Sequence, residues 1–102
     1  MNLFADIPAH ADHELFKTLA ETPHCKIERI VSYGQSSPEG FWYEQTQDEW
    51  VMVLQGEAVL DVSGEMVSLI TGDHLFIQAG VRHRIVSTSA SVPTIWLAVF
   101  CQ

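Results

Sequence analysis

Two glycine-punctuated stretches decide the fold of this chain: Glu49-Trp-Val-Met-Val-Leu-Gln-Gly56 and Gly72-Asp-His-Leu-Phe-Ile-Gln-Ala-Gly-Val-Arg-His83. Side chains alternate between the two faces of a strand, so Glu49, Val51 and Val53 share one face in the first stretch. The opposite face is also apolar, which predicts a strand that is covered on both sides. One face of this strand would point into the interior of a barrel. The other face would be covered by a second sheet, an N-terminal helix or a second subunit.

The remainder of the chain predicts further short strands. β-prone residues separated by turn residues fill the segments 27–33, 41–45, 49–54, 57–62, 65–69, 74–78, 82–87 and 94–100. About eight short strands at close spacing predict an antiparallel sandwich or barrel.

A short helix is expected before these strands. Four apolar residues between positions 12 and 21 recur at helical spacing, namely Leu15, Phe16, Leu19 and Ala20. Asp12 is available as an N-cap, and Pro23 follows shortly beyond the end. The length of 102 residues suits one domain. We therefore expect residues 1–24 to pack as a helical segment on a barrel of residues 25–102.

The amino-acid composition excludes two classes of binding partner. Five Lys and Arg against thirteen Asp and Glu give a net charge of −8, which would repel nucleic acid and anionic membrane surfaces. The apolar runs are too short to span a bilayer, and a cytoplasmic protein is expected. Cys25 and Cys101 stand near opposite ends of the chain, so we expect two reduced thiols and no disulfide framework or zinc finger.

The two stretches resemble the paired motifs of the cupin superfamily. Glu49 and Gly56 match the second half of its first motif, and its second motif is matched by Gly72, Gly80 and His83. The surrounding text, such as Phe41-Trp-Tyr-Glu-Gln, is similar to that of small bacterial cupins. The resemblance implies an antiparallel double-stranded β-helix, known as the jelly-roll or cupin barrel. It also implies a divalent metal ion in the barrel and a homodimer.

The two histidines of the first cupin motif are missing from this chain. They fall at Tyr43 and Gln45 in one permitted register, and at Trp42 and Glu44 in the other. The typical site of three histidines and one glutamate is therefore incomplete.

Glu49 and His83 are nevertheless expected inside the barrel. His83 lies between Arg82 and Arg84 along a predicted strand. Because the charged arginines prefer water, the imidazole should point the other way. A carboxylate and an imidazole in an apolar cavity need compensation, since a buried unpaired charge is costly.

A metal ion such as Zn, Fe, Mn or Ni is one form of compensation. Glu49 and His83 would then be the core ligands and Gln45 the third, with Tyr43 at or near the ion. Glu44 would displace Gln45 if the strand is bulged. The alternative is that Glu49 and His83 hydrogen-bond one another and Tyr43 without an ion.

The first functional hypothesis is a metal-binding cupin that acts on a small organic ligand as an oxygenase, isomerase or lyase. Tyr43 would donate or accept a proton in that reaction. The alternative is a metal-free module that binds or senses a small molecule. A third possibility is a filled barrel that serves as an assembly part. A homodimer is expected through the sheet face that carries Trp50, because large aromatic residues anchor interfaces.

Overall fold

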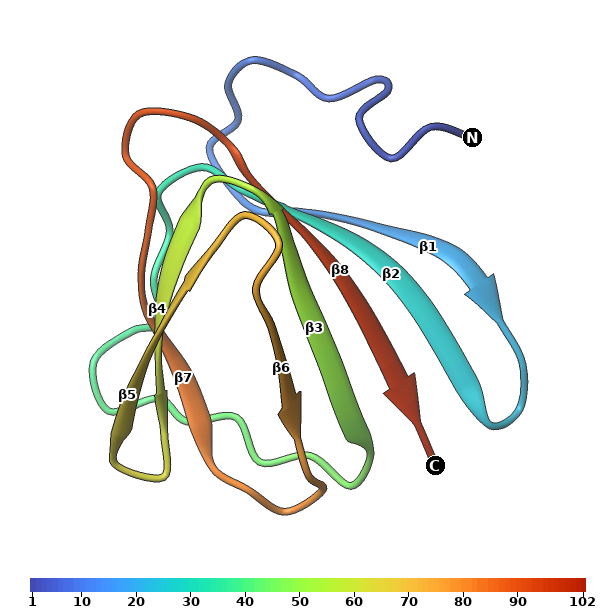
Figure 1. Cartoon of the computed structure of the whole chain (residues 1–102), viewed down its shortest axis with the longest axis vertical. Helices are drawn as coiled ribbons and strands as arrows, with labels where there is room; N and C mark the ends of the chain where they lie inside the picture. Colours follow the sequence, from blue (N-terminus) through green and yellow to red (C-terminus); the bar gives the residue numbers. More distant parts are fainter.

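The computed structural model describes residues 1–102 and contains strands but no helix (Figure 1). The strands are β1 (Leu15–Glu21), β2 (Cys25–Ser32), β3 (Asp48–Gln55), β4 (Glu57–Val62), β5 (Glu65–Ile70), β6 (His74–Ile77), β7 (His83–Thr88) and β8 (Thr94–Cys101). One sheet has the order β1-β2-β8-β3-β6 and the other has the order β5-β4-β7. All strand pairs are antiparallel. The predicted antiparallel β-barrel is confirmed.

The predicted N-terminal helix is wrong, because most of its residues form β1. This strand pairs antiparallel with β2, with Leu15 opposite Val31 and a register shift between Thr18 and Ala20. Leu15 and Leu19 are the two half-buried residues of the strand. Residues four apart share a face in a strand as well as in a helix, so the apolar spacing did not distinguish the two. Pairing with the edge of β2 provides hydrogen-bond partners for the backbone N–H and C=O groups of β1. This tertiary contact overrides the local preference for a helix.

The strand expected over residues 41–45 is also absent. This part of the chain belongs to a loop, residues 33–47, which makes one isolated bridge between Tyr43 and His83. The Tyr43 amide donates to the His83 carbonyl (2.7 Å), and the His83 amide donates to the Tyr43 carbonyl (3.0 Å). Pro38 and Gly40 precede the segment and favour turns over a continuous ladder.

The core lies between the two sheets, and β3 shows the predicted alternation. Glu49, Val51 and Val53 are buried, whereas Trp50 and Met52, which alternate with them, are only partly buried. Eight buried residues form one cluster: Val51, Val53, Ala58, Leu60, Leu69, Ile77, Trp96 and Ala98. Burial of a large apolar side chain contributes about 1.5–3 kcal/mol, so this cluster is the main source of stability.

The N-terminal segment covers part of the outer face of the larger sheet. Val31 and Ile95 lie on that face and are only 1% and 2% exposed. The Arg29 guanidinium, on the same face, donates hydrogen bonds to the carbonyls of Leu3 (3.2 Å) and Ala5 (2.9 Å). The irregular segment therefore supplies the cover that a helix was expected to give.

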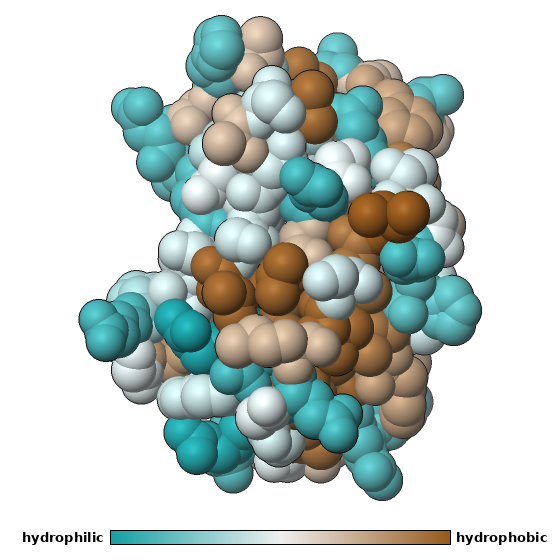
Figure 2. All heavy atoms as spheres, turned by 60° about the vertical axis from the view of Figure 1, so that its left-hand side comes forward, coloured by the Kyte–Doolittle hydropathy of each residue, from teal (hydrophilic) through white to brown (hydrophobic).

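Several large hydrophobic side chains remain on the surface. Met66, Ile70 and Phe76, from β5 and β6, are 64%, 60% and 58% exposed. Figure 2 brings forward the side that carries β4, β5 and β7, and hydrophobic side chains gather there among hydrophilic ones. The structure holds no helix that is long and apolar enough to cross a membrane.

The two cysteines, which lie far apart in the sequence, meet at one end of the β2–β8 pair. Cys25 is the register partner of Cys101, and their sulfur atoms are 3.4 Å apart. Both thiols are free. Opposed residues in antiparallel strands have Cα atoms about 4.5–5.5 Å apart, which is within the range that a disulfide needs.

We therefore expect oxidised glutathione to convert this pair into a disulfide and to leave as two molecules of reduced glutathione. The hydrogen bond with Cys25 raises the pKa of Cys101, so the rate should increase as the pH rises and thiolate forms. Thiol titration measures the loss of both thiols, and Cys25→Ser should instead give a mixed disulfide. Two thiols that persist in the wild type, while Cys25→Ser is modified, would contradict this pairing.

Candidate functional site

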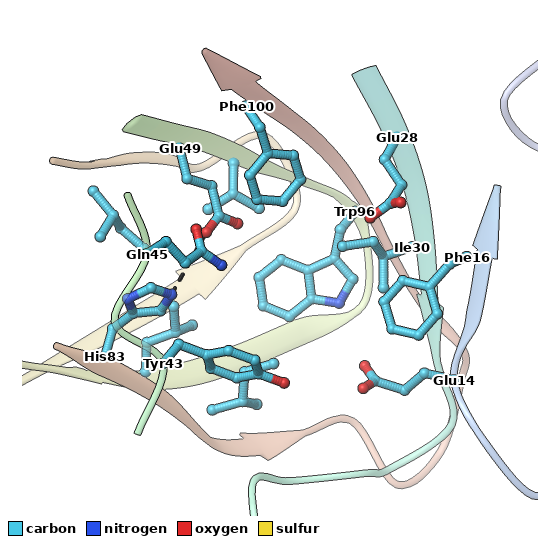
Figure 3. A pocket seen from close by; sticks show the side chains of 14 residues that line it. Glu14, Phe16, Glu28, Ile30, Tyr43, Gln45, Glu49, His83, Trp96 and Phe100 are labelled. Carbon is cyan, nitrogen blue, oxygen red and sulfur yellow. Dashed lines mark ion pairs between the residues drawn. The ribbon is translucent and has the colours of Figure 1, made fainter. Parts of the chain in front are cut away.

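A cavity of about 270 Å³ lies between the two sheets (Figure 3). Fourteen residues line it, and nine of them are hydrophobic. Tyr43 is one of these nine but carries a polar hydroxyl, and the other five lining residues are polar or charged: Glu14, Glu28, Gln45, Glu49 and His83. Apolar walls with a few converging polar groups are typical of sites for small molecules.

Glu49 and His83 form an ion pair at one end of this cavity. Glu49 lies near the start of β3 and His83 is the first residue of β7. The Glu49 Oε1 and His83 Nε2 atoms are 3.5 Å apart, and the two side chains are 11% and 6% exposed. The structure therefore brings together the two residues on which the sequence prediction depended.

The protonation of His83 follows from its two neighbours. Its Nδ1 lies 3.1 Å from the Val81 carbonyl, to which it donates, so Nε2 is the atom that faces Glu49. Burial lowers the pKa of His83, but the hydrogen bonds with Glu49 and Val81 raise it by more. The net pKa lies above the ordinary histidine value, which favours an imidazolium beside the carboxylate.

Tyr43 lies against this pair. Its ring stacks on the His83 ring with centroids 5.5 Å apart, and the Phe41 ring meets it edge-on at 4.9 Å. Burial raises the pKa of Tyr43, and the negative charges of Glu14 and Glu49 raise it further. The phenol therefore stays protonated at neutral pH and can donate a hydrogen bond into the cavity.

The structure resolves which residues replace the missing histidines. Tyr43 and Gln45 line the cavity, whereas Glu44 is exposed and lies outside the lining. Trp42 also points elsewhere, since the Arg82 guanidinium lies over its ring at 4.6 Å from the centroid. Extended backbone alternates its side chains, so one register faces inward and the other outward.

Sequence reasoning missed two carboxylates and a hydrogen-bond chain. Glu14 lies just before β1, and the Ser32 hydroxyl donates to its Oε2 atom (2.5 Å). The Trp96 Nε1 atom donates in turn to the Ser32 hydroxyl oxygen (3.1 Å). Glu28, on β2, is 8% exposed and pairs with the Lys26 ammonium at 3.2 Å. The one available signal was that Glu28 alternates with Ile30 and Ser32 on an inward face.

A second, more polar cleft of about 520 Å³ adjoins the cavity. The two hollows share four lining residues: Glu14, Phe16, Tyr43 and Ile85. These four residues mark the junction of the two hollows, which we call the neck. Phe16 is 62% exposed at this neck although its side chain also lines the cavity.

The donor atoms do not form the metal site that the family resemblance implied. No three His, Cys, Asp or Glu side chains converge anywhere in the structure. In the cavity, Glu49 and His83 supply one carboxylate and one imidazole, and the third donor would be the Gln45 amide. Catalytic metal sites usually use at least three protein ligands, so this set falls short of a preformed site.

Comparison with known proteins decides the family. The cupin domain family matches residues 29–100, which include both Glu49 and His83. This chain belongs to the cupin superfamily. The matched region does not include β1 or the start of β2. No curated protein sequence matches this cupin.

Solved structures share the architecture over 93–100% of this chain. A protein from Ralstonia eutropha JMP134, provisionally named mannose-6-phosphate isomerase, is 48% identical with a TM-score of 0.98, over 100% of this chain and 96% of that one. A cupin superfamily protein from Desulfitobacterium hafniense DCB-2 is 24% identical with a TM-score of 0.78, over 93% of this cupin and 83% of that chain. The TT1209 protein from Thermus thermophilus is 20% identical with a TM-score of 0.82, over 99% of this cupin and 94% of that chain. The last two share the fold alone.

Proposed function

We propose that this cupin binds a small organic molecule in the cavity between its sheets. The observation that carries the proposal is the convergence of Tyr43, Gln45, Glu49 and His83 on one end of a largely apolar cavity of about 270 Å³. This volume is slightly below the range of about 300–1,000 Å³ that is common for ligand pockets, so the ligand is small.

The polar end of the cavity suits a hydroxyl or amino group. The Tyr43 phenol donates, the Glu49 carboxylate accepts, and the Gln45 amide does both. The apolar wall, which includes Ile30 and Phe100, would receive the hydrocarbon part of the ligand. Binding needs no metal ion in this arrangement.

The name of the Ralstonia protein raises the possibility of a sugar phosphate as ligand. Sites for phosphate commonly use Arg or Lys side chains. Neither the cavity nor the adjoining cleft has a Lys or Arg side chain in its lining. We therefore propose that the ligand of this cupin carries no phosphate group.

Proton transfer is the second candidate function. The Tyr43 phenol is stacked on an imidazole that is paired with a carboxylate, so three groups that can exchange protons lie side by side. Burial raises the pKa of Tyr43, which keeps the phenol protonated and suits it to donate a proton. In this candidate Tyr43 is the catalytic residue, and an isomerase is the reaction class that such a set serves without a cofactor. Loss of turnover in Tyr43→Phe with unchanged ligand binding would support it.

A divalent metal on Glu49, His83 and Gln45 stays a prediction. One carboxylate and one imidazole would hold it weakly, because two strong donors leave the coordination incomplete. Elemental analysis of untagged protein and of a His83→Ala variant tests this prediction. A stoichiometric metal that His83→Ala removes would support it, and equal metal content in both proteins would contradict it.

The proposed cavity binding is tested by blocking the neck. Ile85→Trp would fill the space at the neck, whereas Val86→Trp changes the next residue of β7, outside the lining. We use 2-phenylethanol as the probe, in a titration followed by amide NMR shifts. We expect saturable shifts around Tyr43, Gln45 and His83 in the wild type and in Val86→Trp. Binding should weaken more than about tenfold in Ile85→Trp, which corresponds to more than about 1.4 kcal/mol.

We also propose that two copies of this cupin associate through the outer face of the larger sheet. In that face Trp50 pairs in register with Phe76 on β6 and Val99 on β8. Phe76 is 58% exposed, and Trp50 and Val99 beside it are partly exposed. Large apolar side chains exposed next to one another often mark an interface. Sedimentation equilibrium should show a dimer that Phe76→Asp dissociates. Met66→Asp, on the other sheet, is the control, and a monomeric wild type at micromolar concentration would overturn the proposal.

A further inference from the structure

We infer that this cavity selects a ligand with a positively charged nitrogen, held between the Glu14 carboxylate and the surrounding aromatic rings. The inference rests on the proposed binding of a small molecule and specifies the charge of that molecule. Three features of the cavity carry it: the charges in the lining, the partners of those charges, and the rings in the wall.

The charges in the lining have one predominant sign. Three carboxylates, Glu14, Glu28 and Glu49, face the cavity, and Asp12 adds a fourth in the adjoining cleft. No Lys or Arg side chain lines either hollow. Charges interact more strongly in a partly enclosed apolar site than in bulk water, so this field favours a cation over an anion.

The carboxylates differ in their partners. Glu28 is paired with Lys26 at 3.2 Å, and Glu49 is paired with His83 at 3.5 Å. Glu14 instead accepts a hydrogen bond from the neutral Ser32 hydroxyl. Its negative charge is therefore uncompensated within the protein. Glu49 is only 8% exposed and has a single long ion pair, so it keeps capacity to accept a hydrogen bond from the cavity.

Aromatic rings surround the same space. Phe16, Tyr43, Trp96 and Phe100 line the cavity. Figure 3 shows Glu14 and Phe16 together at one side, with the Tyr43 hydroxyl directed toward Glu14 and the Trp96 ring between the two ends. The faces of such rings carry negative charge and attract ammonium groups. The arginines that lie over an aromatic ring do so at Trp42, which is outside the cavity.

Three probes with one shared carbon frame test the inference: 2-phenylethylammonium, 2-phenylethanol and phenylacetate. We expect the ammonium to bind about tenfold more tightly than the alcohol, and phenylacetate to give no saturable NMR shifts. Glu14→Gln keeps an acceptor for Ser32 and should weaken ammonium binding about tenfold more than it weakens alcohol binding. Glu44→Gln removes the same charge from an exposed position outside the lining and should change neither.

Each contrary outcome has a distinct meaning. If the alcohol or phenylacetate binds at least as tightly as the ammonium, and Ile85→Trp still blocks it, charge selection is overturned while cavity binding stands. If Glu14→Gln and Glu44→Gln weaken the ammonium equally, the role assigned to Glu14 is overturned. If none of the three probes binds, both the inference and the proposed function are overturned.

Discussion

Replacement of Gly56 with alanine is expected to destabilise the protein by about 4 kcal/mol, which is the largest effect of any change considered. Gly56 has φ of +88°, and a Cβ atom there would lie 2.6 Å from Thr94 Oγ1 and 2.9 Å from Thr94 Cα. Thr94 cannot easily move, because it is fully buried and its hydroxyl donates to the Glu57 carbonyl at 3.2 Å. The left-handed backbone contributes about 1–2 kcal/mol of this loss and the steric overlap about 1–3 kcal/mol.

Gly64→Ala is the matched control for Gly56→Ala. Gly64 has φ of +96°, but no atom lies within 4 Å of the added Cβ. The control should therefore lose only the backbone component, about 1–2 kcal/mol. Urea unfolding of the two variants and the wild type measures the difference. Equal losses would show that the contact between the β3–β4 turn and Thr94 does not constrain the fold.

The second large effect concerns the buried pair of Glu49 and His83. His83→Leu is expected to cost about 3 kcal/mol, because Glu49 would remain buried without its partner. The double variant Glu49→Leu/His83→Leu should recover much of this loss, since two apolar side chains suit an apolar wall. A double variant that is less stable than His83→Leu would contradict this explanation. In that case the pair itself would be a net source of stability.

The same pair gives a pH dependence with a defined sign. The pKa of His83 is raised in the folded protein, so its contribution is fully present below the ordinary histidine value of about 6.5. The contribution is lost as the pH rises from there through the raised value. Wild-type stability should therefore fall over this interval, and Glu49→Gln should flatten the change. NMR titration of the His83 ring in both proteins checks the cause.

The parts of the fold that follow from strand alternation could be predicted from the sequence. The buried positions of β3 agree with the period of two, and glycine marks the turn after it. The N-terminal helix was wrong because the spacing of Leu15 and Leu19 fits both kinds of element. Whether this segment forms a helix or a strand depends on its pairing with the free edge of β2. The spacing of apolar residues within the segment does not report that pairing.

The candidate site could be predicted where the motif spacing and side-chain direction agree, as for Glu49 and His83. Glu14 could not, because its place in the cavity wall follows from the pairing of β1 with β2. The approach of Cys25 to Cys101 depends in the same way on the register of β2 and β8. Local sequence patterns do not specify the register between two strands, because the register is set by contacts between segments that are distant in the sequence.

The loop of residues 33–47 has a consequence for how new specificities arise in this protein. It supplies Tyr43 and Gln45 to the cavity, yet it joins the barrel without becoming part of a sheet, through a bridge at Tyr43 and a bond from the Gly80 amide to the Gln45 carbonyl (2.8 Å). The opposite wall is built from paired strands. The loop therefore supplies part of the recognition surface without belonging to either sheet, whereas Glu49 and His83 are held by strands. Exchange of loop side chains offers an evolutionary and engineering route to other ligands that leaves the scaffold intact.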